Sequence, residues 1–138
     1  MRKTALAVVG AAVAILALVA CTPEEMTSVT SVNDLRVAHG VAQLAWDEQA
    51  YPVAKQWSQH LADIGTLVHR SNLGDGMPAG WHILGENLAE ADTIDHALAA
   101  LAASPPHLAN ILNPKFDRVA IGVTVANGKT WVVEEFEG

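Results

Sequence analysis

The stretch Ser104-Pro105-Pro106-His107-Leu108-Ala109-Asn110-Ile111-Leu112-Asn113-Pro114 combines helix signals with several polar side chains in eleven residues. Ser104 is suited to cap a helix, because a serine hydroxyl accepts a hydrogen bond from a backbone N–H one turn further on. Pro105 suits the first helical position, where no N–H is needed, and Pro114 forces the helix to end. The pattern therefore predicts a short helix with His107 in its first turn and Asn110 one turn later.

Two further polar signals lie upstream of this helix. They are His69, in a short extended piece, and the tripeptide Gly85-Glu86-Asn87. We expect the chain to fold so that His69, Glu86 and His107 come together. We assign a structural role to Ser104, as the cap, and to Asn87 and Asn110, because asparagine side chains pair with backbone groups that would otherwise be buried without partners.

These residues resemble the bacterial branch of the CAP superfamily (cysteine-rich secretory proteins, antigen 5 and pathogenesis-related 1), whose domain is also called the SCP domain. The resemblance rests on Gly-Glu-Asn at 85–87, on a helix after it, and on Ser-Pro-x-His-x-x-Asn-Ile-Leu at 104–112. It spans about residues 28 to 136. It implies an α+β fold of the CAP/SCP type, a three-layer α–β–α sandwich with two histidines and two glutamates lining a central cleft.

By motif match, the cleft histidines are His69 and His107, and one cleft glutamate is Glu86. The second glutamate of the family sits on a longer helical insert before the second histidine motif. This chain has Leu101-Ala102-Ala103 there, with no carboxylate nearby. The resemblance therefore implies a triad in place of a tetrad.

The remaining residues predict elements that agree with such a fold. Amphipathic spacing and capping residues mark the helices, and Asn127-Gly128 is a strong signal for a tight hairpin. The expected helices cover about 28–39, a segment from the N-cap Asp47 to about 64, 93–103 and the segment after Ser104. The expected strands cover 81–84, 119–125 and 129–136. Helices on both sides of several short strands indicate a three-layer sandwich. Asn33 and Arg36 form either a polar helix face or a tie to the body of the fold.

The first twenty residues predict a signal peptide, because Arg2 and Lys3 precede an apolar run at 5–20. The run ends in Leu18-Val19-Ala20-Cys21, which resembles the bacterial lipobox, in which the cysteine is acylated. The alternative is an ordinary signal peptide with an incidental cysteine. We expect a lipidated Cys21 with a short tether at 21–27, then a CAP/SCP domain at 28–138, exported and anchored by Cys21 to the outer face of the bacterial cell membrane.

The composition restricts the partners. Lys and Arg number 8 against 15 Asp and Glu, for a net charge of −7. Phosphate binding needs a basic surface, so nucleic acid is excluded as a partner. Cys21 is the only cysteine, so acylation leaves no thiol for a disulfide. We expect a monomer that reaches the membrane through acylated Cys21.

The triad supports different chemistries. Two neutral imidazoles, His69 and His107, can bind a divalent metal such as zinc, with water and Glu86 completing the shell. The start of a helix disfavours protonation of His107, which keeps its ring available. Alternatively, Glu86 orients one histidine by a hydrogen bond.

Three functions remain open on this sequence. The first is an extracytoplasmic binding module whose cleft, lined by His69, Glu86 and His107, takes a lipid or cell-envelope ligand. The second is a zinc-dependent hydrolase or peptidase that uses the same residues, with Glu86 as the candidate catalytic group. The third is a surface interaction domain in which the triad is purely structural.

Overall fold

The computed structural model of the protein describes residues 21–138, so the expected signal peptide and most of the lipobox lie outside the described residues. Within the described range, no helix is both long and apolar enough to cross a membrane. The elements, in chain order, are α1 (Pro23–Ala38), β1 (Ala45–Trp46), α2 (Tyr51–Ile64), β2 (Leu84–Ala91), α3 (Ile94–Ala103), α4 (Pro105–Ile111), β3 (Arg118–Ala126) and β4 (Lys129–Glu137).

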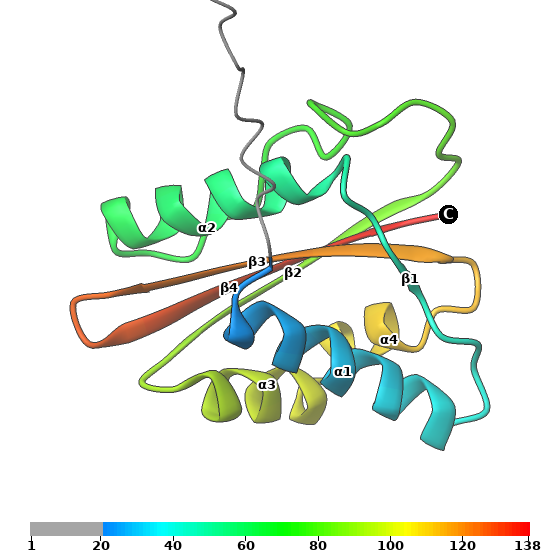
Figure 1. Cartoon of the computed structure of the whole chain (residues 1–138), viewed down its shortest axis with the longest axis horizontal. Coiled ribbons are helices and arrows are strands. Elements are labelled where there is room, and N and C mark those ends of the chain that lie inside the picture. Colours follow the sequence, from blue (N-terminus) through cyan, green and yellow to red (C-terminus); the bar gives the residue numbers. More distant parts are fainter. Residues whose placement is uncertain (1–20) are drawn as a thin grey trace, which may run out of the picture.

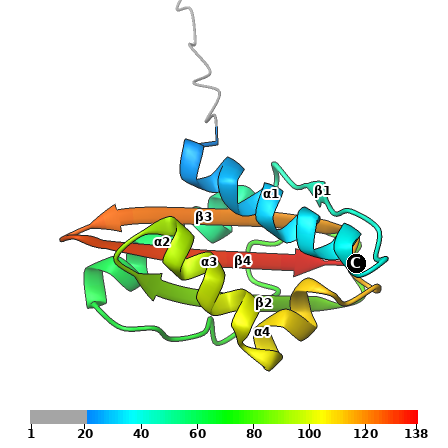
Figure 2. The ribbon, with the colours of Figure 1, turned by 90° about the horizontal axis from the view of Figure 1, so that it is seen from below.

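The four strands form one sheet between two helical layers (Figure 1). The strand order is β1-β3-β4-β2; β1 pairs with β3 in parallel, and the other pairs are antiparallel. One face of the sheet is covered by α2, and α1, α3 and α4 cover the other (Figure 2). The predicted α+β fold, a three-layer sandwich, is confirmed.

Each face of the sheet has its own apolar core. On the α2 side, Trp131 and Val133 of β4 pack with Leu88 of β2. On the other side, Val132 and Phe136 belong to the larger cluster beneath α1, α3 and α4. Because successive side chains of a strand point to opposite faces, residues 86 and 135 belong to the α2 side, and residues 87 and 134 to the other.

The segment at 22–27 is not the tether that its composition suggests, because α1 begins at Pro23. Thr22 and Glu25 form a capping box, in which each side chain binds the other's backbone N–H. The carboxylate of Glu25 is fully buried and accepts hydrogen bonds from the Tyr51 hydroxyl and the Val123 N–H. These contacts hold the start of the helix on the body of the fold.

Later in α1, Asn33 and Arg36 tie the helix to the fold, which decides between the two predicted roles. The Asn33 amide exchanges hydrogen bonds with the backbone of Leu44. The buried Arg36 guanidinium donates to the carbonyls of Ala42, Ile111, Asn113 and Phe116. Arg36 therefore fixes α1 against the end of α4.

Besides the start of α1, two predicted boundaries are wrong. Helix α2 begins at Tyr51 with Ala50 at the N-cap position, and not directly after Asp47, although the Asp47 carboxylate does accept hydrogen bonds from the Gln49 and Ala50 N–H groups. The strand expected at 81–84 instead runs from Leu84 through Ala91. The strand therefore contains the Gly-Glu-Asn tripeptide, because pairing with β4 along its whole length outweighs the turn tendency of glycine and asparagine.

Candidate functional site

The edge strand β2 carries Glu86 at the centre of the candidate site. Glu86 is buried, and its Oε1 lies 2.5 Å from Nδ1 of His69. The same oxygen accepts a hydrogen bond of 3.2 Å from the Arg70 N–H. The His69 side chain is 62% exposed, so the buried carboxylate orients an imidazole whose other nitrogen remains available at the surface.

A second carboxyl group lies beside Glu86. Glu135 of β4 is the cross-strand partner of Glu86, and its side chain is 1% exposed. Burial, followed by the hydrogen bond and charge of Glu86, raises the pKa of Glu135 well above its ordinary value, although Arg70 opposes the shift. The buried Oε2 of Glu86 has no hydrogen-bond partner within the described residues, and a protonated Glu135 is the neighbouring group that can donate a hydrogen bond to it.

Arg70 connects this carboxyl pair to the loop that follows His69. Its Nη1 lies 3.1 Å from Glu135 Oε1 and donates to the Leu73 carbonyl at 3.1 Å. Its Nη2 donates to the carbonyl of Asp75. One largely buried guanidinium thus positions both the carboxyl pair and the loop at 72–76.

On the opposite face of β2, Asn87 forms a buried polar network. Its Nδ2 donates to Glu134 Oε2 and to the backbone carbonyl of His107, both at 3.0 Å, and its Oδ1 accepts from Asn110 Nδ2 at 2.9 Å. Burial raises the pKa of Glu134 to about 7, while the Asn87 amide lowers it. The network fixes α4 beside β2.

His107 and Ser104 line a groove at the free edge of β2. The groove has a volume of about 210 Å³, and its other lining residues are Leu67, Leu88, Ala89, Glu90, Ala100 and Leu101. Burial, followed by the positive charge of His69, lowers the pKa of His107. The lowered pKa agrees with the prediction that protonation of His107 is disfavoured. The causes, however, are burial and the charge of His69, and not the start of the helix. Ser104 precedes α4 as predicted, yet its hydroxyl makes no capping bond.

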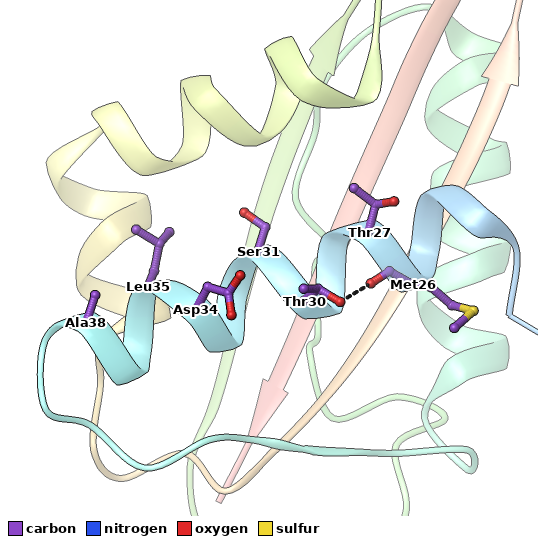
Figure 3. A pocket seen from close by; sticks show the side chains of 7 residues that line it. All are labelled: Met26, Thr27, Thr30, Ser31, Asp34, Leu35 and Ala38. Carbon is purple, nitrogen blue, oxygen red and sulfur yellow. Dashed lines mark hydrogen bonds between the residues drawn. The ribbon is translucent and has the colours of Figure 1, made fainter.

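A larger hollow lies along one face of α1 (Figure 3). Its volume is about 710 Å³, and it is lined by Met26, Thr27, Thr30, Ser31, Asp34, Leu35 and Ala38. All of these side chains come from one helix and include a single carboxylate and no histidine. The hollow brings together no pair of groups suited to acid–base chemistry, so we locate the candidate site at β2.

The donor set does not fit a zinc centre of the catalytic kind, which needs three protein ligands and an open position. Across residues 21–138, no three His, Cys, Asp or Glu side chains are arranged to hold a metal ion. His69 uses Nδ1 on Glu86, and Glu135 is engaged by Arg70. That His69 and His107 bind a metal remains a prediction.

The structure brings His69 into contact with Glu86, but of the three predicted cleft residues only His107 lines the groove beside β2. Sequence reasoning missed Glu135, Arg70 and Glu134. A signal was present for the two glutamates, because Glu134 and Glu135 are successive residues of the strand expected at 129–136 and therefore face opposite layers of the sandwich. Acids in such a strand must be paired or protonated.

The comparisons with known proteins agree with this architecture. The family model described as CAP, the cysteine-rich secretory protein family, matches residues 29–136. No curated protein matches the chain. An extracellular protein with an SCP domain from Bacillus anthracis is 26% identical to this chain, with a TM-score of 0.72. The match covers 83% of this chain and 40% of that chain, so this chain spans less than half of that protein.

More distant structures share the fold alone. An outer surface protein from Borrelia burgdorferi is 19% identical, with a TM-score of 0.72 and coverage of 86% of this chain and 95% of that chain. NaASP2, crystallised with Zn²⁺, is 12% identical, with a TM-score of 0.62 and coverage of 83% and 80%. Since the family model covers most of the described residues, and the sheet and helices match its solved relatives, the chain belongs to the CAP family of cysteine-rich secretory proteins.

Proposed function

We propose that this protein is an extracytoplasmic binding module whose groove beside β2 takes the apolar part of a lipid or another cell-envelope ligand. The observation that carries the proposal is the composition of the groove. Leucine and alanine side chains form most of its wall, and its polar lining residues are Glu90, Ser104 and His107. An apolar wall with a few polar groups is typical of pockets for small amphipathic ligands.

The size of the groove limits what it encloses. Its volume of about 210 Å³ lies below the roughly 300–1,000 Å³ of pockets that enclose a whole drug-sized ligand. It therefore takes one apolar segment, such as part of an acyl chain, while the remainder of the ligand stays outside. Each buried methylene contributes roughly 0.8 kcal/mol to binding.

The polar groups favour a ligand with an uncharged head. Burial and His69 lower the pKa of His107, so its ring is neutral at pH 7 and offers one donor and one acceptor. The Ser104 hydroxyl, which makes no capping bond, offers the same pair. With a net charge of −7, the protein repels anionic head groups.

We also propose that the protein is exported and attached to the membrane through acylated Cys21. Two structural neighbours are described as an extracellular protein and an outer surface protein, and the residues before Cys21 resemble a lipobox. Because α1 begins at Pro23, the domain would sit directly against its anchor. Mass measurement of the protein extracted from a lipoprotein-competent bacterium tests this, and an unmodified Cys21 would contradict it.

Two substitutions on α3 test the groove. Ala100 lines it, whereas Ala99, exposed on the same helix, does not. We expect Ala100→Trp to fill the groove and weaken binding of a fluorescent fatty-acyl alcohol by at least tenfold, and Ala99→Trp to leave it unchanged. Equal binding by both variants, or no binding by the unmodified protein, would refute the proposed function.

Zinc titration tests the metal-dependent alternative. Because the described residues offer no three-ligand site, we expect no stoichiometric submicromolar binding by calorimetry of residues 22–138. Tight binding that disappears in His107→Ala would contradict this and favour a metal-assisted hydrolase.

A further inference from the structure

A separate groove lies between α2 and the loop that follows it. Its volume is about 460 Å³, and it is lined by Val53, Gln56, Trp57 and His60 of α2 and by Arg70, Asp75 and Gly76 of the following loop. The two grooves have no lining residue in common. This volume falls within the range of pockets that hold small ligands.

An aromatic pair forms one wall of this groove. The rings of Trp57 and His60 lie with centroids 4.6 Å apart at an angle of 31°. The Trp57 Nε1–H donates to the Val68 carbonyl at 3.0 Å, which fixes the orientation of the indole. A fixed aromatic surface beside polar groups suits a ligand that has both a C–H face and hydroxyl groups.

The opposite wall is a loop held in place by buried charge. Arg70 donates to the carbonyls of Leu73 and Asp75 as well as to Glu135, so its guanidinium is already engaged. The Asn72 amide donates to Asp75 Oδ1 at 2.6 Å. The loop is therefore ordered before any ligand arrives, which lowers the entropy lost on binding.

The free polar groups of the groove define the ligand chemistry. Gln56 and Asp75 are both exposed, and among residues 21–138 no hydrogen bond engages the Gln56 amide or the second carboxylate oxygen of Asp75. Together they supply donors and acceptors at opposite walls. No uncommitted cation lines the groove, and the carboxylate of Asp75 repels anions.

From these features we propose that the groove is a binding site for a neutral sugar. One face of the sugar ring packs on Trp57 and His60, while its hydroxyl groups bind the Gln56 amide and the Asp75 carboxylate. Anionic sugars are rejected for lack of a free cation. The proposal goes beyond the proposed apolar groove and does not depend on it.

The test is a titration of the ¹⁵N-labelled domain with uncharged trisaccharides of glucose and of N-acetylglucosamine, monitored by NMR. We expect shifts at Gln56, Trp57 and Asp75. His60→Ala and Gln56→Ala should each raise the dissociation constant by about tenfold, as expected for the loss of one stacking or hydrogen-bonding partner. Gln59→Ala is the matched control, because Gln59 is exposed on the same helix and binds Asp63.

Two kinds of ligand distinguish whether the sugar comes from a glycolipid or from a glycan. An octyl glycoside that binds more tightly than the free trisaccharides indicates the head group of a glycolipid, and tighter binding of the trisaccharides indicates a glycan. The proposal is overturned if no neutral sugar shifts these resonances at millimolar concentration. It is also overturned if His60→Ala and Gln56→Ala bind as the unmodified protein does, or if polygalacturonate binds more tightly than the neutral sugars.

Discussion

The carboxyl group of Glu135 shows how a single residue sets the state of the site. Its neighbour Glu86 contacts His69, and two adjacent buried carboxylates cannot both be ionised at low energetic cost. Burial and Glu86 raise the pKa of Glu135 to about 9, so Glu135 holds its proton at neutral pH. Glu135 thereby supplies, from a different element, a carboxyl group beside the triad.

Substitution of Glu135 tests this arrangement. Glu135→Gln keeps a neutral donor for Glu86 and an acceptor for Arg70, so we expect the free energy of unfolding at pH 7 to stay close to that of the unmodified protein. Glu135→Leu removes the donor for Glu86 and the acceptor for Arg70, so buried polar groups lose their partners. This should lower the free energy of unfolding by about 1–3 kcal/mol. Urea unfolding followed by fluorescence measures the difference, and equal stability of the two variants would contradict a protonated Glu135 that donates to Glu86.

Helix α1 shows what sequence patterns can and cannot predict at the scale of an element. The helix after Ser104 and the hairpin at Asn127-Gly128 follow local rules, and both occur as predicted. The start of α1 could not be found in this way, because the partners that hold Glu25 come from α2 and β3, far along the chain. The same reasoning applies to β2, whose length is set by its pairing with β4.

The capping residue of α1 gives a prediction at this scale. Burial raises the pKa of Glu25, but hydrogen bonds from the Thr22 and Val123 backbones, Tyr51 and Lys55 outweigh it and lower the pKa. Glu25→Ala leaves the Tyr51 hydroxyl and the Val123 N–H without partners.

We expect the free energy of unfolding of Glu25→Ala to fall by about 3 kcal/mol. Asp34→Ala, an exposed acid on the same helix, should change it by less than about 0.5 kcal/mol. Denaturant titration distinguishes the two, and a similar small effect of both would show that the hydrogen bonds of Glu25 contribute little to holding α1 on the fold.

For the molecule as a whole, the buried acids of β4 couple folding to pH. Burial raises the pKa of Glu134 to about 7, and burial together with Asp47 raises that of Glu137 to about 7. Between about pH 4.5 and 7 the folded chain retains protons that the unfolded chain has released, so the stabilisation present at low pH is lost as pH rises. The pKa of His107 is lowered, so the unfolded chain binds this proton more readily than the folded chain. His107 therefore makes the free energy of unfolding rise with pH.

We therefore expect the free energy of unfolding to fall between pH 5 and 8, with Glu134 alone contributing about 3 kcal/mol. Glu134→Gln removes the titrating group while its amide oxygen still accepts the bond from Asn87. This variant should show a flatter profile and higher relative stability at pH 8, because no buried carboxylate forms there. Urea unfolding at a series of pH values measures both curves. If the two curves ran parallel, Glu134 would already be ionised in the folded protein, and Asn87 would be sufficient to stabilise its charge.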